Sequence, residues 1–135
     1  PPMPGAFELL NKIKKEGYTI VLVTGSGQKS LLSRLEEHYP GIFQPDLMVT
    51  AFDVQHGKPN PEPYLMGLEK AGVRPEEALV VENAPLGVQA ASAANIYTIA
   101  VNTGPLEPEM LLGNGADILY TSVSALYNRF DSLLK

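Results

Sequence analysis

Short apolar segments alternate with helix-like segments along almost the whole chain. The run YTIVLVT at 18–24 is rich in β-branched residues and has a glycine on each side, which is typical of a strand buried on both faces of a sheet. Such runs separated by helices are typical of parallel strands joined by crossover connections. The predicted strands are 18–24, 47–50, 78–81, 96–101 and 118–120, and the predicted helices are 6–13, 28–38, 62–71, 86–94, 108–112 and one from 122 onward. We therefore expect an α/β fold with a Rossmann-like doubly wound parallel sheet, formed as one domain by residues 1–135.

The predicted last helix has a clear amphipathic pattern. Apolar residues recur on one of its faces at helical spacing, at Val123, Leu126, Tyr127, Phe130 and Leu134. We expect this face to be buried in the core.

The composition excludes several classes of protein. The net charge is −5 and no basic run could neutralise a series of phosphates, so nucleic acid is not an expected partner. The absence of Cys excludes disulfides and thiol chemistry, and no apolar run approaches the roughly 20 residues that a membrane span needs. We expect a cytoplasmic protein without membrane binding. Because the chain opens on Pro1 rather than Met, we also expect that an upstream segment was removed or left out.

Ligands of open parallel sheets bind beyond the carboxyl ends of the strands, and three of these ends carry polar residues. After the first predicted strand, the Thr24 hydroxyl and the Gly25 amide could bind a phosphate oxygen, helped by the positive end of the following helix. The alternative is an ordinary turn with Ser26 as the helix cap.

The segment after the second predicted strand holds Lys58 between closely spaced prolines, in HGKPNPEPY at 56–64. A lysine at a defined position could neutralise a transferring phosphoryl group. The alternative is a solvated lysine on a polyproline-like loop. We interpret His56 as a surface residue.

The third strand end carries Glu82 and Asn83. Both offer oxygen atoms, which Mg²⁺ prefers as ligands, so the pair could form part of a metal site. Alternatively, Asn83 caps the next helix and Glu82 is a favourable charge at its N-terminus.

Taken together and in this order, these segments resemble three of the four motifs of the haloacid dehalogenase-like hydrolases. Thr24 matches the second motif, Lys58 the third, and Glu82 with Asn83 the fourth. The opening PxPG before a helix resembles the phosphoglucomutase-like branch. The resemblance implies a phosphatase that cleaves monoesters of a small phosphorylated metabolite through an aspartyl-phosphate intermediate. It further implies that Mg²⁺ is the cofactor, that Thr24, Gly25 and Lys58 bind phosphate, and that Thr24 and Lys58 are catalytic.

Two departures from the family pattern affect these expectations. Asn83 stands where relatives carry a second acid, so we expect weaker metal binding. The first motif, Asp-x-Asp on the central strand, is absent, because no two of the Asp residues lie two positions apart: Asp46, Asp53, Asp117 and Asp131. We therefore expect the core fragment of a longer enzyme, without its nucleophile strand and cap, and inactive alone.

A sheet without its central strand must either pair the flanking strands directly or leave unpaired edges, through which we expect self-association. Two functions remain open beside the hydrolase: a sugar-phosphate mutase, and a non-catalytic Rossmann-like binding or regulatory domain.

Overall fold

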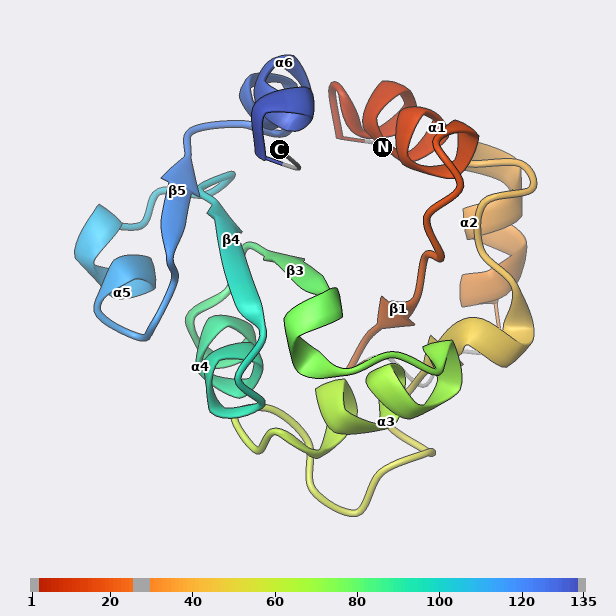
Figure 1. The fold of residues 1–135 in the computed structure, drawn as a ribbon, viewed down its shortest axis with the longest axis horizontal. Coiled ribbons are helices and arrows are strands. Elements are labelled where there is room, and N and C mark those ends of the chain that lie inside the picture. The colour runs from red at the N-terminus through yellow and green to blue at the C-terminus, as the bar shows by residue number, and fades with distance from the viewer. Residues whose placement is uncertain (1–2, 26–29, 134–135) are drawn as a thin grey trace.

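The computed structural model describes residues 3–25 and 30–133, in which helices and strands alternate as predicted (Figure 1). The helices are α1 (Ala6–Lys15), α2 (Leu31–His38), α3 (Glu62–Ala71), α4 (Pro85–Ala93), α5 (Pro108–Leu112) and α6 (Val123–Leu133), with short 3-10 turns at Pro45–Leu47 and Pro75–Glu77. The strands are β1 (Leu22–Val23), β2 (Met48–Val49), β3 (Leu79–Glu82), β4 (Tyr97–Val101) and β5 (Ile118–Tyr120). The order of elements confirms the predicted α/β class.

All the strand pairs in the described residues are parallel, but they belong to two separate sheets. β1 pairs with β2, with Val23 opposite Val49. The second sheet has the order β3-β4-β5, with Glu82 opposite Ala100. β1 and β3 are not hydrogen-bonded to each other in the described part of the chain, and they stand apart in Figure 1. The sheet is therefore interrupted where the central strand was expected to be missing, and it leaves unpaired edges.

The expectation that the first strand is buried on both faces was wrong. Only two of the seven predicted residues form β1, both are half-buried, and Tyr18 is 46% exposed. β3 shows the same effect on one face: Leu79 and Val81 are 36% and 42% exposed, whereas Val80 is buried. Within the described residues, β1 and β3 each lack a neighbouring strand on the interrupted side, which leaves these apolar side chains accessible.

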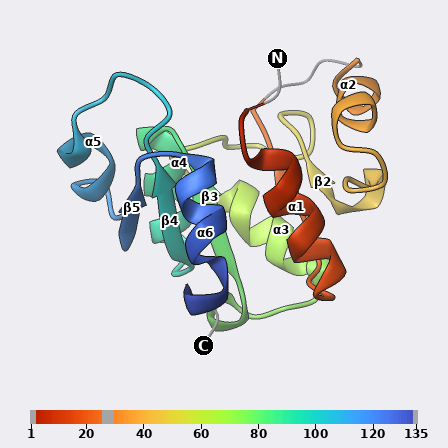
Figure 2. The same cartoon turned by 90° about the horizontal axis from the view of Figure 1, so that it is seen from above.

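The apolar core consists of separate clusters of buried residues, each formed by different helices packed against the strands. α3 and α4 bury one cluster against β3, which includes Tyr64, Leu68, Val80, Ala90 and Ala91. α1 and α6 bury another against β4, which consists of Leu9, Ile99, Val101, Val123, Leu126 and Phe130. Figures 1 and 2 both show α1 beside α6, so elements from opposite ends of the described chain complete this layer.

The predicted apolar face of the last helix is only partly confirmed. Val123, Leu126 and Phe130 are buried, but Tyr127 is 36% exposed at the edge of the α1 contact, where Lys12 Nζ lies 6.0 Å from its ring centre. Leu134 lies outside the described residues.

Among the described residues, none of the helices combines the length and the apolar character needed to cross a membrane.

Candidate phosphate- and metal-binding site

Thr24 follows β1 directly, at the carboxyl end of the strand. Its backbone N–H donates to the Val49 carbonyl at 2.9 Å, which ties this end of β1 to β2. Thr24 is half-buried and Gly25 is exposed, with open space where a Cβ would stand. Ser26, the alternative helix cap, lies outside the described residues. Phosphate binding by the Thr24 hydroxyl and the Gly25 amide stays a prediction.

The loop between β2 and α3 is held in shape by two carboxylates. Asp53 accepts hydrogen bonds from the Thr50 N–H at 2.7 Å and the Thr50 hydroxyl at 3.0 Å, and these bonds lower the pKa of Asp53. Glu62, in the first turn of α3, accepts from the backbone N–H groups of Gln55 at 2.8 Å and His56 at 3.1 Å. His56 is exposed, as expected. These hydrogen bonds therefore fix the backbone of the loop that contains Lys58.

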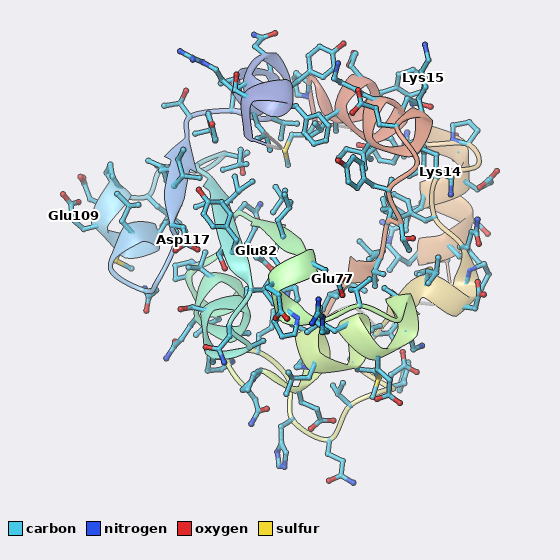
Figure 3. The ribbon with its side chains drawn as sticks, viewed as in Figure 1. Lys14, Lys15, Glu77, Glu82, Glu109 and Asp117 are labelled. Carbon is cyan, nitrogen blue, oxygen red and sulfur yellow. The ribbon has the colours of Figure 1, made fainter. Side chains whose placement is uncertain are left out.

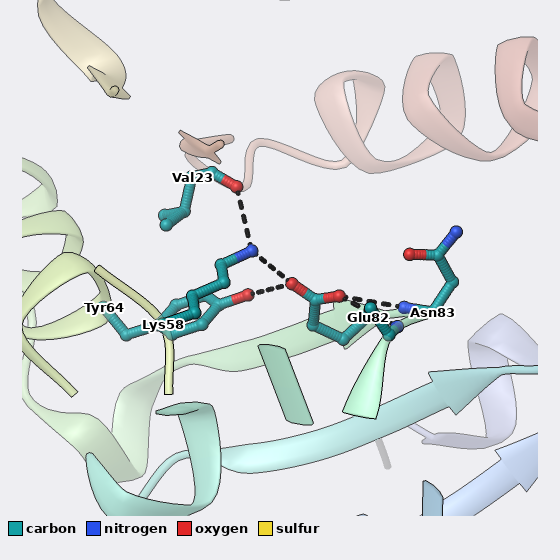
Figure 4. Close-up of polar contacts among 6 residues, drawn as sticks. Val23, Lys58, Tyr64, Glu82 and Asn83 are labelled. Carbon is teal, nitrogen blue, oxygen red and sulfur yellow. Dashed lines mark hydrogen bonds and ion pairs between the residues drawn. The ribbon is translucent and has the colours of Figure 1, made fainter. Parts of the chain in front are cut away.

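Lys58 lies across the interruption between the two sheets. Its ammonium forms an ion pair with Glu82 Oε1 at the end of β3 and donates a hydrogen bond of 3.4 Å to the Val23 carbonyl of β1 (Figure 4). The Lys58 side chain is 22% exposed and that of Glu82 only 9%. The alternative of a solvated lysine does not fit, because the Lys58 side chain is mostly buried and its ammonium contacts two protein groups. The structure brings two of the predicted site residues, Lys58 and Glu82, into direct contact.

The Glu82 carboxylate accepts hydrogen bonds at both oxygens. Oε1 accepts from Lys58 and from the Tyr64 hydroxyl at 2.7 Å, and Oε2 accepts from the N–H groups of Asn83 at 3.0 Å and Ala84 at 3.3 Å. The last two bonds are those of an acid at a helix N-terminus, so the predicted electrostatic role at α4 fits the geometry as well. With four donors around it, Glu82 must release one of them to coordinate a cation directly.

Tyr64 was not predicted as a site residue. An aromatic residue at the start of an apolar helix face reads as core, and Tyr64 is indeed 6% exposed within the α3–α4 cluster. Its hydroxyl, however, faces Glu82, and burial together with the Glu82 charge raises the Tyr64 pKa far above its ordinary value. Only the positions of β3 and α3 relative to each other reveal this contact.

Asn83 is exposed at the start of the turn into α4. Its Nδ2 donates to Thr103 Oγ1 at 3.2 Å, and its Oδ1 accepts no hydrogen bond from the part of the chain that the structure describes. The alternative that Asn83 caps α4 was wrong, because the cap position is Ala84 and no side chain caps it. Asn83 Oδ1 is therefore free to bind a cation.

These residues can supply only part of a magnesium site. Within residues 3–25 and 30–133, no three His, Asp or Glu side chains converge as a metal site would require. Figure 3 shows Glu82 facing the interior of the molecule, whereas Glu109, Lys14 and Lys15 lie at its outside. The Asn83 amide oxygen and the Glu82 carboxylate, which already accepts hydrogen bonds, are oxygen ligands of the kind that a hard cation prefers. An octahedral ion would need further ligands.

Comparisons with known proteins identify the family of the chain. The family model described as haloacid dehalogenase-like hydrolase matches residues 1–101. The chain belongs to this family. It is 35% identical over 124 residues to hexitol phosphatase A of Escherichia coli, covering 92% of this chain and 55% of that protein. It is also 35% identical over 127 residues to glycerol-1-phosphate phosphohydrolase 2 of Saccharomyces cerevisiae, covering 87% of this chain and 49% of that protein.

Solved structures indicate the branch of the family. A candidate beta-phosphoglucomutase from Bacteroides vulgatus is 61% identical with a TM-score of 0.94, covering 98% of this chain and 53% of that one. CbbY from Rhodobacter sphaeroides, solved in complex with phosphate, is 26% identical with a TM-score of 0.80, covering 92% of this chain and 55% of that one. This member of the haloacid dehalogenase-like hydrolases thus falls in the phosphoglucomutase-like branch and spans about half the length of the relatives it matches.

Proposed function

We propose that the chain is the phosphate-holding part of a magnesium-dependent hydrolase that acts on phosphate monoesters of a small metabolite. The observation that carries the proposal is the Lys58 ammonium, fixed by Glu82 at the carboxyl ends of β1 and β3. A cation at this edge of a parallel sheet is well placed to attract a phosphoryl group. The curated relatives named above are phosphatases of sugar-alcohol and glycerol phosphates, which supports this substrate class.

In the proposed site each residue has a separate task. The Thr24 hydroxyl and the Gly25 N–H donate hydrogen bonds to phosphoryl oxygens, and Lys58 balances their charge. Glu82 keeps the ammonium in place. Asn83 Oδ1 would be a ligand of Mg²⁺, with Glu82 beside it, and the bound ion would supply further neutralisation of phosphoryl charge.

The nucleophile of the proposed reaction does not belong to this chain. We propose that it is the first Asp of an Asp-x-Asp on an added parallel strand between β1 and β3, whose edges are unpaired. Its carboxylate would attack phosphorus and release the alcohol, and water would then hydrolyse the aspartyl phosphate. The second Asp would exchange protons with the leaving group and the water. The chain alone is accordingly proposed to be inactive.

A sugar-phosphate mutase is the second candidate. The 61% identity to the candidate beta-phosphoglucomutase favours it, because the same core could pass the phosphoryl group to a sugar hydroxyl instead of water. We further propose a cytoplasmic location, in keeping with a chain that has no Cys.

The test compares the product of the complete reading frame with the chain alone. Intact-mass spectrometry of the expressed product establishes whether a longer form carries Asp-x-Asp. A magnesium-dependent assay of that form on hexitol, glycerol and hexose phosphates should release inorganic phosphate, and Lys58→Ala should lower the rate by about 100-fold or more. Isomerised sugar phosphate without phosphate release would favour the mutase. A reading frame without Asp-x-Asp and without activity would leave a non-catalytic binding domain.

A further inference from the structure

We propose that Tyr64 is a positioning residue whose hydroxyl orients the Glu82 carboxylate and, through it, the Lys58 ammonium. The link to phosphate binding rests on the function proposed above, whereas the orientation of Glu82 does not. Tyr64 touches both members of the ion pair. Its hydroxyl donates to Glu82 Oε1 at 2.7 Å, and Lys58 Nζ lies 5.3 Å from the centre of its ring.

The surroundings of Tyr64 hold its ring in one place. It is buried in the α3–α4 cluster with Leu68 and Val80, and Val80 precedes Glu82 by two positions on the same face of β3. A rotation of the ring would therefore disturb the core, so the hydroxyl position is fixed by packing. A donor fixed in this way selects one orientation of the carboxylate.

The Tyr64 hydroxyl is the donor of its bond to Glu82, because a phenol is protonated near neutral pH and an ionised carboxylate has only acceptors. The Glu82 carboxylate also packs closely against Gly87 of α4, since a Cβ added at this glycine would stand 2.1 Å from its carboxyl carbon.

The first turn of α3 carries Tyr64 and also contacts the loop that contains Lys58. Glu62 binds the backbone of Gln55 and His56, and two residues later Tyr64 binds Glu82. The same helical turn thus fixes the backbone that carries Lys58 and the acid that holds its ammonium. We infer that loss of the hydroxyl frees Glu82 Oε1 to rotate, weakens the two N–H bonds to Oε2, and allows the ammonium to leave the end of β1.

Tyr64→Phe tests this inference because it removes the hydroxyl and keeps the ring. Tyr97→Phe is the matched control, since the Tyr97 side chain is 46% exposed and its hydroxyl makes no hydrogen bond within the described residues. In the isotope-labelled chain, amide exchange of Asn83 and Ala84 should become about fivefold faster in Tyr64→Phe, beyond any change in global stability. Inorganic phosphate titrated with Mg²⁺ should bind about tenfold more weakly. Tyr97→Phe should change neither.

A third variant separates the hydroxyl from packing. Tyr64→Leu removes the ring as well, and we expect the same loss of phosphate affinity as in Tyr64→Phe, with an additional loss of stability. If the Asn83 and Ala84 amides are unchanged in Tyr64→Phe, or if phosphate affinity falls only in Tyr64→Leu, the positioning role is overturned. If the amides respond as expected but the unsubstituted chain binds no phosphate, the positioning of Glu82 stands and the proposed function of this chain fails.

Discussion

Lys58 and Glu82 lie 24 positions apart in the sequence and form an ion pair across the interruption between two parallel sheets. The pair joins the end of β3 to the Val23 carbonyl of β1, which no strand hydrogen bond does in the described residues. The ion pair is therefore both the centre of the candidate site and a structural link between the two sheets.

The charge of Lys58 should contribute to stability. Lys58→Met keeps most of the unbranched side chain but leaves the Glu82 carboxylate, 9% exposed, without its cation. We expect the free energy of unfolding to fall by about 2–3 kcal/mol, since an uncompensated charge of low exposure remains. Urea denaturation measures the change, and Lys58→Met combined with Glu82→Gln should recover part of it. Lys15→Met on the exposed end of α1 is the control; equal effects of Lys58→Met and Lys15→Met would contradict the prediction.

Gly87 leaves room for the Glu82 carboxylate. A Cβ at this position would lie 2.1 Å from both the carboxyl carbon and Oε1 of Glu82, whose hydrogen bonds keep it from moving aside freely. Alanine would otherwise favour a helix interior by up to about 1 kcal/mol, so the collision reverses the expected sign. We expect Gly87→Ala to destabilise the protein by about 1–2 kcal/mol in urea unfolding. Gly104→Ala, with nothing near its Cβ, should be close to neutral. A stabilised Gly87→Ala variant would show that Glu82 moves without cost.

The amide at position 83 should limit magnesium affinity. Asn83→Asp adds a negative charge beside an oxygen that accepts no hydrogen bond within the described chain. We expect Mg²⁺ to bind about tenfold more tightly in a calorimetric titration, because hard cations favour carboxylates. Asn128→Asp adds the same charge on the exposed surface of α6 and should have little effect. Equal affinities of Asn83→Asp and the unsubstituted chain would refute the prediction.

Asp53 should make a small contribution to stability that depends on pH. The Thr50 hydrogen bonds lower its pKa below the ordinary 3.8 in the folded state, so the stabilisation is present above that value and is lost as pH falls through the folded pKa. Because the side chain is largely exposed, we expect only a few tenths of a kcal/mol. The difference in urea midpoint between the unsubstituted chain and Asp53→Asn should be largest near neutral pH and should shrink in acid. A difference that stays constant with pH would contradict this origin, and Asp46→Asn serves as the control.

The unpaired edges should lead to self-association. Leu79 and Val81 expose apolar surface on the strand that borders the interruption. In sedimentation velocity we expect the weight-average sedimentation coefficient to rise with protein concentration. Val81→Lys should reduce this rise, since an edge lysine opposes strand pairing. Leu112→Lys, at an exposed position of α5, should not. Monomers at every concentration would exclude association through these edges.

Much of the site could be read from local pattern. The apolar runs and their spacing predicted the order of elements, and α3 and α5 have the predicted bounds. Because parallel strands end on the same side of a sheet, the polar residues after three strands also indicated where the candidate site lies. The ion pair between Lys58 and Glu82 was not among the predictions. The contact of Tyr64 with Glu82 could not be predicted, since an aromatic residue in an apolar helix face carries no signal of where its hydroxyl points.

The sequence by itself determined the class of fold, the family and the residue types at the strand ends, because these depend on periodicity and on spacing within short segments. Tertiary structure alone decided which surfaces are covered. Leu79 and Val81 have the apolar character of a buried strand, yet their burial depends on a neighbouring strand that the described chain does not provide. In the same way, only the tertiary structure places Lys58 between the Val23 carbonyl and the Glu82 carboxylate, which lie far from it in the sequence.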